Sequence, residues 1–291
     1  MQNKDITCAF FGGEPLAVPV LEALKKAEIV PKLIITNPDR KSGRSQELTS
    51  PPAKEWAQKH NIPVYQPTSF KEQGMHHLLE DSSWDVFLVA AYNMILPKWL
   101  IDIPEHGTLN LHPSLLPKLR GASPIRSAIL EDIRETGVSI MHMDEQMDHG
   151  PIIAQEKITI DPSNWPLRGK ELDNLLTHTG SELFVQTIPA WINGTVAENP
   201  QDHTKATYTK KFTKEDGLID ITDDPYTNLL KIRAFDGAPG TYFFIKTPKG
   251  NLRVKIIDAK LSPKNTLHIL RIIPEGKKEI LYEEFIRNFK S

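Results

Sequence analysis

The stretch of residues 107–150 constrains this chain more than any other part of the sequence. Within it, Asn110 and His112 stand two residues apart in a short apolar strand pattern. Side chains repeat every second residue along a strand, so both point to the same side. Pro113 cannot donate a hydrogen bond to a sheet, so the strand is predicted to end there. The Asn110/His112 pair is therefore expected at the carboxyl end of a strand.

That edge of an open α/β sheet is where ligands bind. A later turn with the sequence Asp-His-Gly-Pro adds a carboxylate at Asp148. An amide beside an imidazole suits a developing oxyanion, and a carboxylate suits the proton that follows. As an opposite charge, Asp148 is expected to favour the protonated imidazole of His112. A histidine alone at a strand end is more often structural, so the predicted catalytic role depends on all three residues.

The start of the chain predicts the fold class. Residues 6–11 are a continuous apolar run that ends in two glycines, as in a buried parallel strand followed by a tight turn. A helical pattern opens at Pro15, and residues 30–36 supply a second strand. This unit is the opening of a doubly wound α/β sheet. The full Gly-x-Gly-x-x-Gly pattern is missing, so a dinucleotide is not indicated.

The same patterns predict elements along the rest of the chain. Further strands are expected over residues 62–66, 85–92, 109–112, 137–143, 152–160, 240–246, 252–259 and 266–273. Helices are expected over residues 15–26, 52–59, 70–80, 124–130, 167–193 and 224–235.

Bulk properties indicate a soluble two-domain protein. The chain has 291 residues, of which 39% are hydrophobic and 25% charged. It contains no run of eighteen apolar residues, and its start is too polar for a signal peptide. The single cysteine, Cys8, allows no internal disulfide, lies in an apolar run typical of a core, and fits a reducing compartment. We therefore expect a cytoplasmic protein without a membrane anchor.

The small net charge hides an asymmetry. Residues 206–291 contain 16 Lys and Arg against 11 Asp and Glu, a net charge of +5, which leaves −7 for residues 1–205. A basic carboxyl-terminal part favours a polyanionic partner at that end. On charge alone, a solvated surface explains the pattern equally well.

Three motifs carry a family resemblance. They are Asn110-Leu-His112-Pro-Ser-Leu-Leu-Pro117, Arg120-Gly-Ala-Ser-Pro124 and Asp148-His-Gly150. Together they resemble the signature of the folate-dependent formyltransferases and, within them, most resemble the methionyl-tRNA formyltransferases. The resemblance implies a Rossmann-like catalytic domain with Asn110, His112 and Asp148 as catalytic residues. It also implies 10-formyltetrahydrofolate as co-substrate and no metal.

The resemblance places the folate against two turns. One follows the apolar strand of residues 85–92, and the other follows the Asn110/His112 strand. The residues that it assigns to folate binding are Tyr92, Ile95, Leu96, Pro97, Ser114, Leu115, Leu116 and Pro117. For Leu96 and Pro97, closing a turn and filling the core is an equally good interpretation.

Cations in two segments are candidates for binding tRNA. Residues 37–52 combine Gly, Ser and Pro with Arg40, Lys41 and Arg44, which is typical of a loop. Such a loop is either solvated or a phosphate-binding element, and the resemblance to the loop that enters the tRNA acceptor stem favours the second. Lys210 and Lys211 stand in a Tyr-x-x-Lys segment that, in the family, opens the second domain.

The expected domains are residues 1–193 for catalysis, a linker over 194–207, and a tRNA-binding domain over 208–291. Short alternating strands in the last part suggest a small barrel related to the OB fold. Between residues 260 and 267 the chain is about one hairpin shorter than is usual in the family, so this barrel is expected to be incomplete.

The function implied is transfer of a formyl group from 10-formyltetrahydrofolate to the amino group of initiator methionyl-tRNA, by a protein expected to be a monomer. Two alternatives remain at this point. One is a formyltransferase for the amine of a sugar nucleotide, because the catalytic core is shared. The other is a nucleic-acid-binding protein that kept the fold without catalysis, against which the intact Asn110, His112 and Asp148 set argues.

Overall fold

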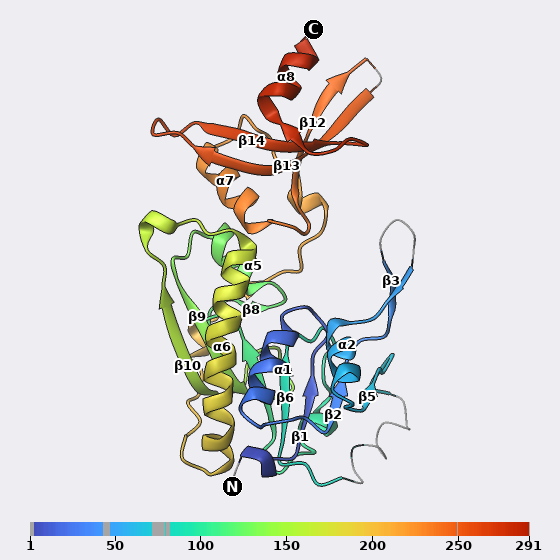
Figure 1. Cartoon of the computed structure of the whole chain (residues 1–291). Coiled ribbons are helices and arrows are strands. Elements are labelled where there is room, and N and C mark those ends of the chain that lie inside the picture. Colours follow the sequence, from blue (N-terminus) through green and yellow to red (C-terminus); the bar gives the residue numbers. More distant parts are fainter. Residues whose placement is uncertain (1–2, 43–46, 72–78, 80–81, 249, 291) are drawn as a thin grey trace. The chain divides into compact units, whose positions relative to one another are not determined.

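The computed structural model describes residues 3–42, 47–71, 79, 82–248 and 250–290 (Figure 1). The helices are α1 Ala17–Lys26, α2 Pro52–Lys59, α4 Lys98–Ile101, α5 Pro124–Leu130, α6 Gly169–Ile192, α7 Pro225–Ala234 and α8 Tyr282–Lys290. Single 3-10 turns are η1 Asn3–Asp5, η2 Pro162–Asn164, η3 His203–Lys205 and η4 Glu215–Gly217. The strands are β1 Cys8–Phe11, β2 Leu33–Ile35, β3 Arg40–Ser42, β4 Glu47–Thr49, β5 Val64–Tyr65, β6 Val86–Ala90, β7 Thr108–His112, β8 Arg120–Gly121, β9 Glu135–His142, β10 Ile152–Thr159, β11 Tyr208–Thr209, β12 Thr241–Thr247, β13 Gly250–Leu261, β14 Leu267–Pro274 and β15 Ile280–Leu281.

The chain forms two compact units. Unit 1 comprises residues 1–122, 137–158 and 175–208, and unit 2 comprises residues 123–136, 159–174 and 209–291. No helix among the residues that the structure describes has both the length and the apolar character needed to cross a membrane.

Unit 1 is built on a seven-stranded sheet in the order β10-β9-β7-β6-β1-β2-β5. The pairs from β7 through β6, β1 and β2 to β5 are parallel, whereas β7 and β9 are antiparallel. From β1 the chain first adds strands on one side and then returns to add β6 on the other. The topological switch point therefore lies between β1 and β6, which confirms the predicted doubly wound α/β core. The antiparallel β7–β9 pair makes the sheet mixed, which the sequence did not predict.

The central strands are apolar and buried on both faces. All residues of β1, β2 and β6 are buried, as expected for parallel strands covered on both sides. Cys8 belongs to this core, and burial raises the pKa of its thiol to about 12. This places the only cysteine among packing residues.

The position of α6 shows which face of the sheet carries the candidate catalytic side chains. A Cβ added to Gly180 of α6 would lie 2.8 Å from a methyl carbon of Leu111, so the helix sits directly on that side chain. Asn110 and His112 alternate with Leu111 and face the other side of the sheet. There Asn110 is in register with Val89, which belongs to the core cluster that includes Leu100 of α4.

Unit 2 contains a four-stranded antiparallel sheet in the order β12-β13-β14-β15. Its core is formed by inward side chains of the sheet, by Ile232 of α7 and by Phe285 of α8. The sequence patterns predicted β12, β13, β14 and α7, whereas β15 and α8 were not predicted. Strand β15 is only two residues long and carries no period. In α8, Tyr282, Phe285, Ile286 and Phe289 recur at helical spacing, a signal that our reading of the sequence missed.

Other differences concern residues 37–52 and 70–80. The first stretch, expected as a loop, contains the antiparallel β3–β4 hairpin, with Arg40 paired to Thr49 and Lys41 to Leu48. The predicted helix over 70–80 lies largely outside the described residues. The two-stranded ladder of β8 and β11 was also not predicted, because each strand is only two residues long.

Gly12, just after β1, is a close-contact position at the switch point. A Cβ at this position would lie 2.8 Å from the carbonyl oxygen of Ala90 and 2.9 Å from the Cβ of Ala17. We expect Gly12→Ala to lower the free energy of unfolding by about 1–3 kcal/mol, because the backbone on either side must move. At Gly13 the atom nearest to an added Cβ is the side-chain nitrogen of Asn37. Because this is a side-chain atom and not backbone, Gly13→Ala should lower the free energy of unfolding by less than Gly12→Ala. Urea denaturation of both variants measures the two values, and an equal or larger loss at Gly13 would contradict the prediction.

Candidate active site

Asn110 offers an uncommitted amide at the carboxyl half of β7. Its backbone is held in the sheet between Val89 of β6 and Met141 of β9. The side chain is partly exposed, and within the residues that the structure describes it makes no hydrogen bond. A rigid strand thus presents an N–H donor whose hydrogen-bonding capacity is available to a ligand.

His112, at the end of β7, has a fixed ring orientation. It is 5% exposed, and its Nε2 lies 3.0 Å from the carbonyl oxygen of Leu119. A carbonyl oxygen only accepts, so Nε2 carries the proton and donates it to this bond. The other ring nitrogen, Nδ1, lies 3.6 Å from Oδ1 of Asp148. A neutral His112 therefore has its basic nitrogen on the side of Asp148, and a cationic one has both nitrogens as donors.

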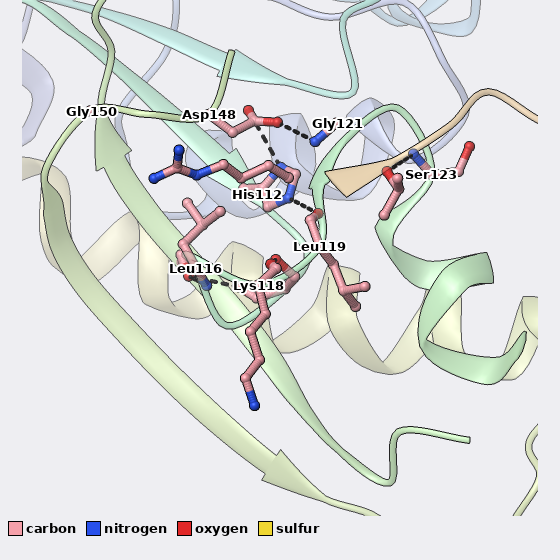
Figure 2. Close-up of polar contacts among 12 residues, drawn as sticks. His112, Leu116, Lys118, Leu119, Gly121, Ser123, Asp148 and Gly150 are labelled. Carbon is pink, nitrogen blue, oxygen red and sulfur yellow. Dashed lines mark hydrogen bonds and ion pairs between the residues drawn. The ribbon is translucent and has the colours of Figure 1, made fainter. Parts of the chain in front are cut away.

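Asp148 is held in place by the backbone of the Arg-Gly-Ala motif. The N–H of Gly121 donates to its Oδ2 at 2.7 Å, which leaves Oδ1 on the side of His112. Figure 2 shows the carboxylate between Gly121 and the imidazole, whose far nitrogen is bonded to Leu119. The Asp148 backbone is left-handed, with φ of 49°, an uncommon conformation for a side chain-bearing residue.

The segment expected as a linker, residues 194–207, forms hydrogen bonds with the residues next to Gly121. The N–H of Leu119 donates to the hydroxyl of Thr207, and the N–H of Arg120 donates to the Thr207 carbonyl, both at 2.8 Å. The buried amide of Gln201 also contacts Arg120. These interactions were not predicted, because they join residues more than 80 positions apart in a stretch without hydrophobic period.

The geometry combines a neutral donor, a histidine with one committed nitrogen, and a fixed carboxylate. Such a set can stabilise an oxyanion and accept a proton next to it. Among the described residues, no three His, Cys, Asp or Glu side chains are grouped closely enough to hold a metal ion.

Comparison with known proteins identifies the family. Residues 6–188 match the family described as formyl transferase. A methionyl-tRNA formyltransferase of Chloroflexus aurantiacus is 42% identical over 237 residues, which cover 81% of this chain and 75% of that protein. One of Carboxydothermus hydrogenoformans is 32% identical over 305 aligned positions, with 97% and 96% covered. The chain belongs to the formyl transferase family.

Within that family, these relatives group it with the methionyl-tRNA formyltransferases. The fold is also found in the crystal structure of an N-formyltransferase from Helicobacter canadensis, in complex with folinic acid and dTDP-3-aminofucose. Its TM-score is 0.65 at 21% identity, covering 88% of each chain, so this likeness concerns the fold.

The turn of residues 114–117, expected to contact folate, is held by a local hydrogen bond and by two from β9 and β10. The Ser114 hydroxyl donates to the carbonyl of Lys118 at 2.6 Å, and the Leu116 N–H donates to the hydroxyl of Ser139 at 3.1 Å. The amide of Gln155 donates to the Leu116 carbonyl at 3.0 Å. Ser114 and Leu116 are buried, whereas Leu115 and Pro117 are partly exposed. The one polar side chain of the turn, Ser114, is thus already hydrogen-bonded, so the turn can support a ligand mainly through its shape and its apolar side chains.

The second expected folate segment, residues 92–97, has unpaired backbone groups. Tyr92 is packed edge-on against Phe11, and burial raises the pKa of its hydroxyl. Leu96 is buried, Pro97 is partly exposed, and Ile95 is 78% exposed. Within the described part of the chain, no backbone N–H or carbonyl from residue 92 to 96 is hydrogen-bonded. This turn can therefore offer both backbone donors and an apolar surface.

The expected tRNA-binding cations are placed as follows. Arg40 and Lys41 lie exposed on β3 and make no ion pair within the described residues, whereas Arg44 lies outside them. In unit 2, Lys210 pairs with Asp216 at 2.5 Å, and this hydrogen bond lowers the pKa of Asp216 to about 2. Lys211 is exposed. Lys210 thus has its charge largely compensated in this structure.

The base of the β3–β4 hairpin is fixed through Asp39. Lys54 of α2 donates to both carboxylate oxygens, at 2.9 and 2.7 Å, and the Gln66 amide donates at 2.7 Å. These hydrogen bonds, with that of Lys54 the largest, lower the pKa of the Asp39 carboxyl below its ordinary 3.8. The ionised form of Asp39 therefore stabilises the folded protein.

A pH dependence follows from this shift. Since the folded pKa of Asp39 is depressed, its contribution to stability is fully present above pH 3.8 and is lost as the pH falls through the folded pKa. We expect Asp39→Asn to lower the melting temperature at pH 7, and the difference from the wild type to shrink only below about pH 4. Melting curves between pH 7 and pH 3 measure it. A difference that stays constant down to pH 3 would contradict the role of the ionised carboxylate.

Proposed function

We propose that this protein transfers the formyl group of 10-formyltetrahydrofolate to the α-amino group of methionine on initiator tRNA. One observation carries the proposal: the uncommitted Asn110 amide lies on β7 beside the His112–Asp148 pair, in a chain of the formyl transferase family. The relatives named for methionyl-tRNA formylation support the acceptor at 42% and 32% identity. The product is N-formylmethionyl-tRNA, which starts protein synthesis.

In the reaction, the free amine attacks the formyl carbon, and a new C–N bond forms while the bond to the donor nitrogen breaks. The carbonyl oxygen gains negative charge in between. We assign the Asn110 N–H as a donor to that oxygen, because it is fixed on a strand before the reaction starts. His112 in its protonated form adds a charge-assisted donor through Nδ1.

The proton that the amine loses must reach the leaving donor nitrogen. Asp148 is placed for this step, because its Oδ2 is held by Gly121 and its Oδ1 remains beside His112. A carboxylate and an imidazole 3.6 Å apart can take up and return one proton between them. No step in this scheme is assigned to a metal.

The residues expected to hold the folate fit a flat heterocycle with donors and acceptors on its edge. The unpaired backbone of residues 92–96 supplies hydrogen-bonding groups, and the exposed Ile95 supplies apolar surface. We propose that Tyr92, Leu96 and Pro97 set the shape of this turn. We further propose that the turn of Ser114, Leu115, Leu116 and Pro117 supports the folate from the other strand.

For the tRNA, we propose that Arg40, Lys41 and Arg44 contact backbone phosphates from the β3–β4 hairpin. In unit 2 we propose a second contact through Lys211, with Lys210 joining once the tRNA competes with Asp216. The four-stranded sheet of unit 2 supports a small domain of OB-like character that is shortened after β13. Such domains bind nucleic acid through a charged face. A cytoplasmic, monomeric enzyme is proposed with this partner.

The sugar-nucleotide alternative is less well supported. The solved sugar formyltransferase with dTDP and 5-N-formyl-THF has a TM-score of 0.65 but only 20% identity to this chain. That likeness covers the fold, whereas the curated relatives at 32% to 42% identity carry the tRNA function in their names.

The test is formyl transfer from 10-formyltetrahydrofolate, with charged initiator methionyl-tRNA and an amino-sugar nucleotide assayed in parallel. Transfer to the tRNA alone is the expected result. Transfer to the sugar alone would retain the catalytic assignment and overturn the acceptor. Transfer to neither, with folate still bound, would favour the non-catalytic alternative.

The oxyanion role of Asn110 predicts a large catalytic effect. Asn110→Ala should lower kcat by about 100- to 1,000-fold, the usual result of removing one such donor. Its side chain bonds no described residue, so the melting temperature should change little. Steady-state kinetics and a thermal melt on the same preparation measure both quantities. A variant that retains wild-type kcat would show that Asn110 is not the oxyanion donor.

The phosphate-binding role of the hairpin predicts a change in salt dependence. Replacing Arg40 and Lys41 by Gln should weaken tRNA binding and reduce the slope of log Kd against log salt by about one for each phosphate that these side chains neutralise. The matched control replaces Lys26 and Lys59, two exposed lysines on α1 and α2, and removes the same charge. If both double variants change the slope equally, the hairpin acts only through net charge.

A further inference from the structure

A glutamine far from the signature motifs lies against the backbone that carries Asp148. Gln201 is 6% exposed and follows the isolated bridge between Ile152 and Asn199. Its Nε2 donates to the carbonyl of Asp148 at 3.0 Å and to the carbonyl of Gly150 at 2.7 Å. One side-chain amide therefore satisfies the two carbonyls on either side of His149.

The orientation of this amide is set by a buried guanidinium. Arg120 is 1% exposed, and its Nε and Nη2 donate to Oε1 of Gln201 at 3.2 and 2.6 Å. A guanidinium has only donors, so the atom facing Arg120 must be the oxygen and the atom facing the turn must be the nitrogen. Arg120 in turn donates to Nδ1 of His203 at 2.9 Å and to the Tyr208 hydroxyl at 3.3 Å.

The bonds from Gln201 help to orient the Asp148 carboxylate. The Asp148 backbone is in the left-handed region, which a residue with a side chain occupies only at a cost. Two hydrogen bonds from Gln201 hold the carbonyls at both ends of that turn, while Gly121 holds the side chain. The direction of the carboxylate toward His112 is thus determined by the turn as well as by its own bond.

We propose that Gln201 is a positioning residue for Asp148, with Arg120 fixing the amide in the required orientation. This inference rests on the proposed catalytic role of Asp148. Gln201 contacts no reacting atom in this scheme and acts through the Asp148–Gly150 turn. Its replacement should lower kcat, because the Asp148 carboxylate would no longer be held beside His112. The binding of the formyl donor should be unaffected.

Gln201→Glu is the sharpest variant. It keeps an oxygen for Arg120 and nearly the same shape, but it replaces the donor facing the two carbonyls by an acceptor. A displacement of about 1 Å at a catalytic group can cost about 100-fold in rate. We therefore expect kcat to fall by about that factor, with the KM for 10-formyltetrahydrofolate unchanged.

A double-mutant cycle with Asp148→Asn separates positioning from general support of the fold. If Gln201 acts through Asp148, Gln201→Glu should cause little further reduction of kcat in the Asp148→Asn background. A purely structural residue would give the same fold-reduction in both backgrounds. The matched control is Gln155→Glu, since Gln155 also donates to a backbone carbonyl, that of Leu116, without contacting Asp148. Its effect should be the same in both backgrounds.

Each outcome decides one question. Equal reductions from Gln201→Glu in both backgrounds, or unchanged kcat in the single variant, would overturn the proposal. If Asp148→Asn alone keeps wild-type kcat, the catalytic assignment fails, and the positioning proposal fails with it for that separate reason. Should Gln201→Glu not fold, the same cycle with Gln201→Met gives the answer, because Met removes the donor without adding charge.

Discussion

The hydrogen bond from Nε2 of His112 to the carbonyl of Leu119 fixes the imidazole on which the rest of the candidate site depends. It commits one ring nitrogen to the protein and leaves the other facing Asp148. The loop that supplies the carbonyl also supplies the Gly121 N–H for the carboxylate. One short segment, residues 119–121, therefore orients both His112 and Asp148, and β7 orients the neutral amide of Asn110. The three candidate catalytic side chains are thus oriented mainly by backbone groups.

Most of the fold could be predicted from the sequence, because the central strands bury both faces and read as continuous apolar runs. The strands predicted over residues 85–92 and 109–112 agree with the bounds of β6 and β7 to within a few residues. Elements of two residues, such as β8 and β11, carry no period to detect, and the β3–β4 hairpin was expected as a loop because its residues are polar. The ladder of β8 and β11 depends on pairing between distant segments, whereas the β3–β4 hairpin is a local pairing of polar residues.

The candidate site shows the same division. Alternation along a strand placed Asn110 and His112 on one face, and the structure has them facing away from Leu111 and α6. The hydrogen bonds of Gln201, Thr207 and Arg120 could not be predicted, since a buried polar side chain leaves no mark in a sequence unless its partner is known. Whether Asn110, His112 and Asp148 act as assigned remains a prediction for the experiments above.

The path of residues 199–208 has a consequence for how the chain can be divided. This segment pairs with β10 at Ile152, bonds the loop at Leu119 and ends in β11 against β8. A fragment cut at the end of α6 would contain every signature motif, yet the carbonyls of Asp148 and Gly150 would lose their donor Gln201. Arg120 would lose its bonds to Gln201, His203 and Tyr208. The smallest piece of this chain that keeps the hydrogen bonds around the candidate site therefore ends beyond β11, and gene fusions or split versions should place their junctions after that strand.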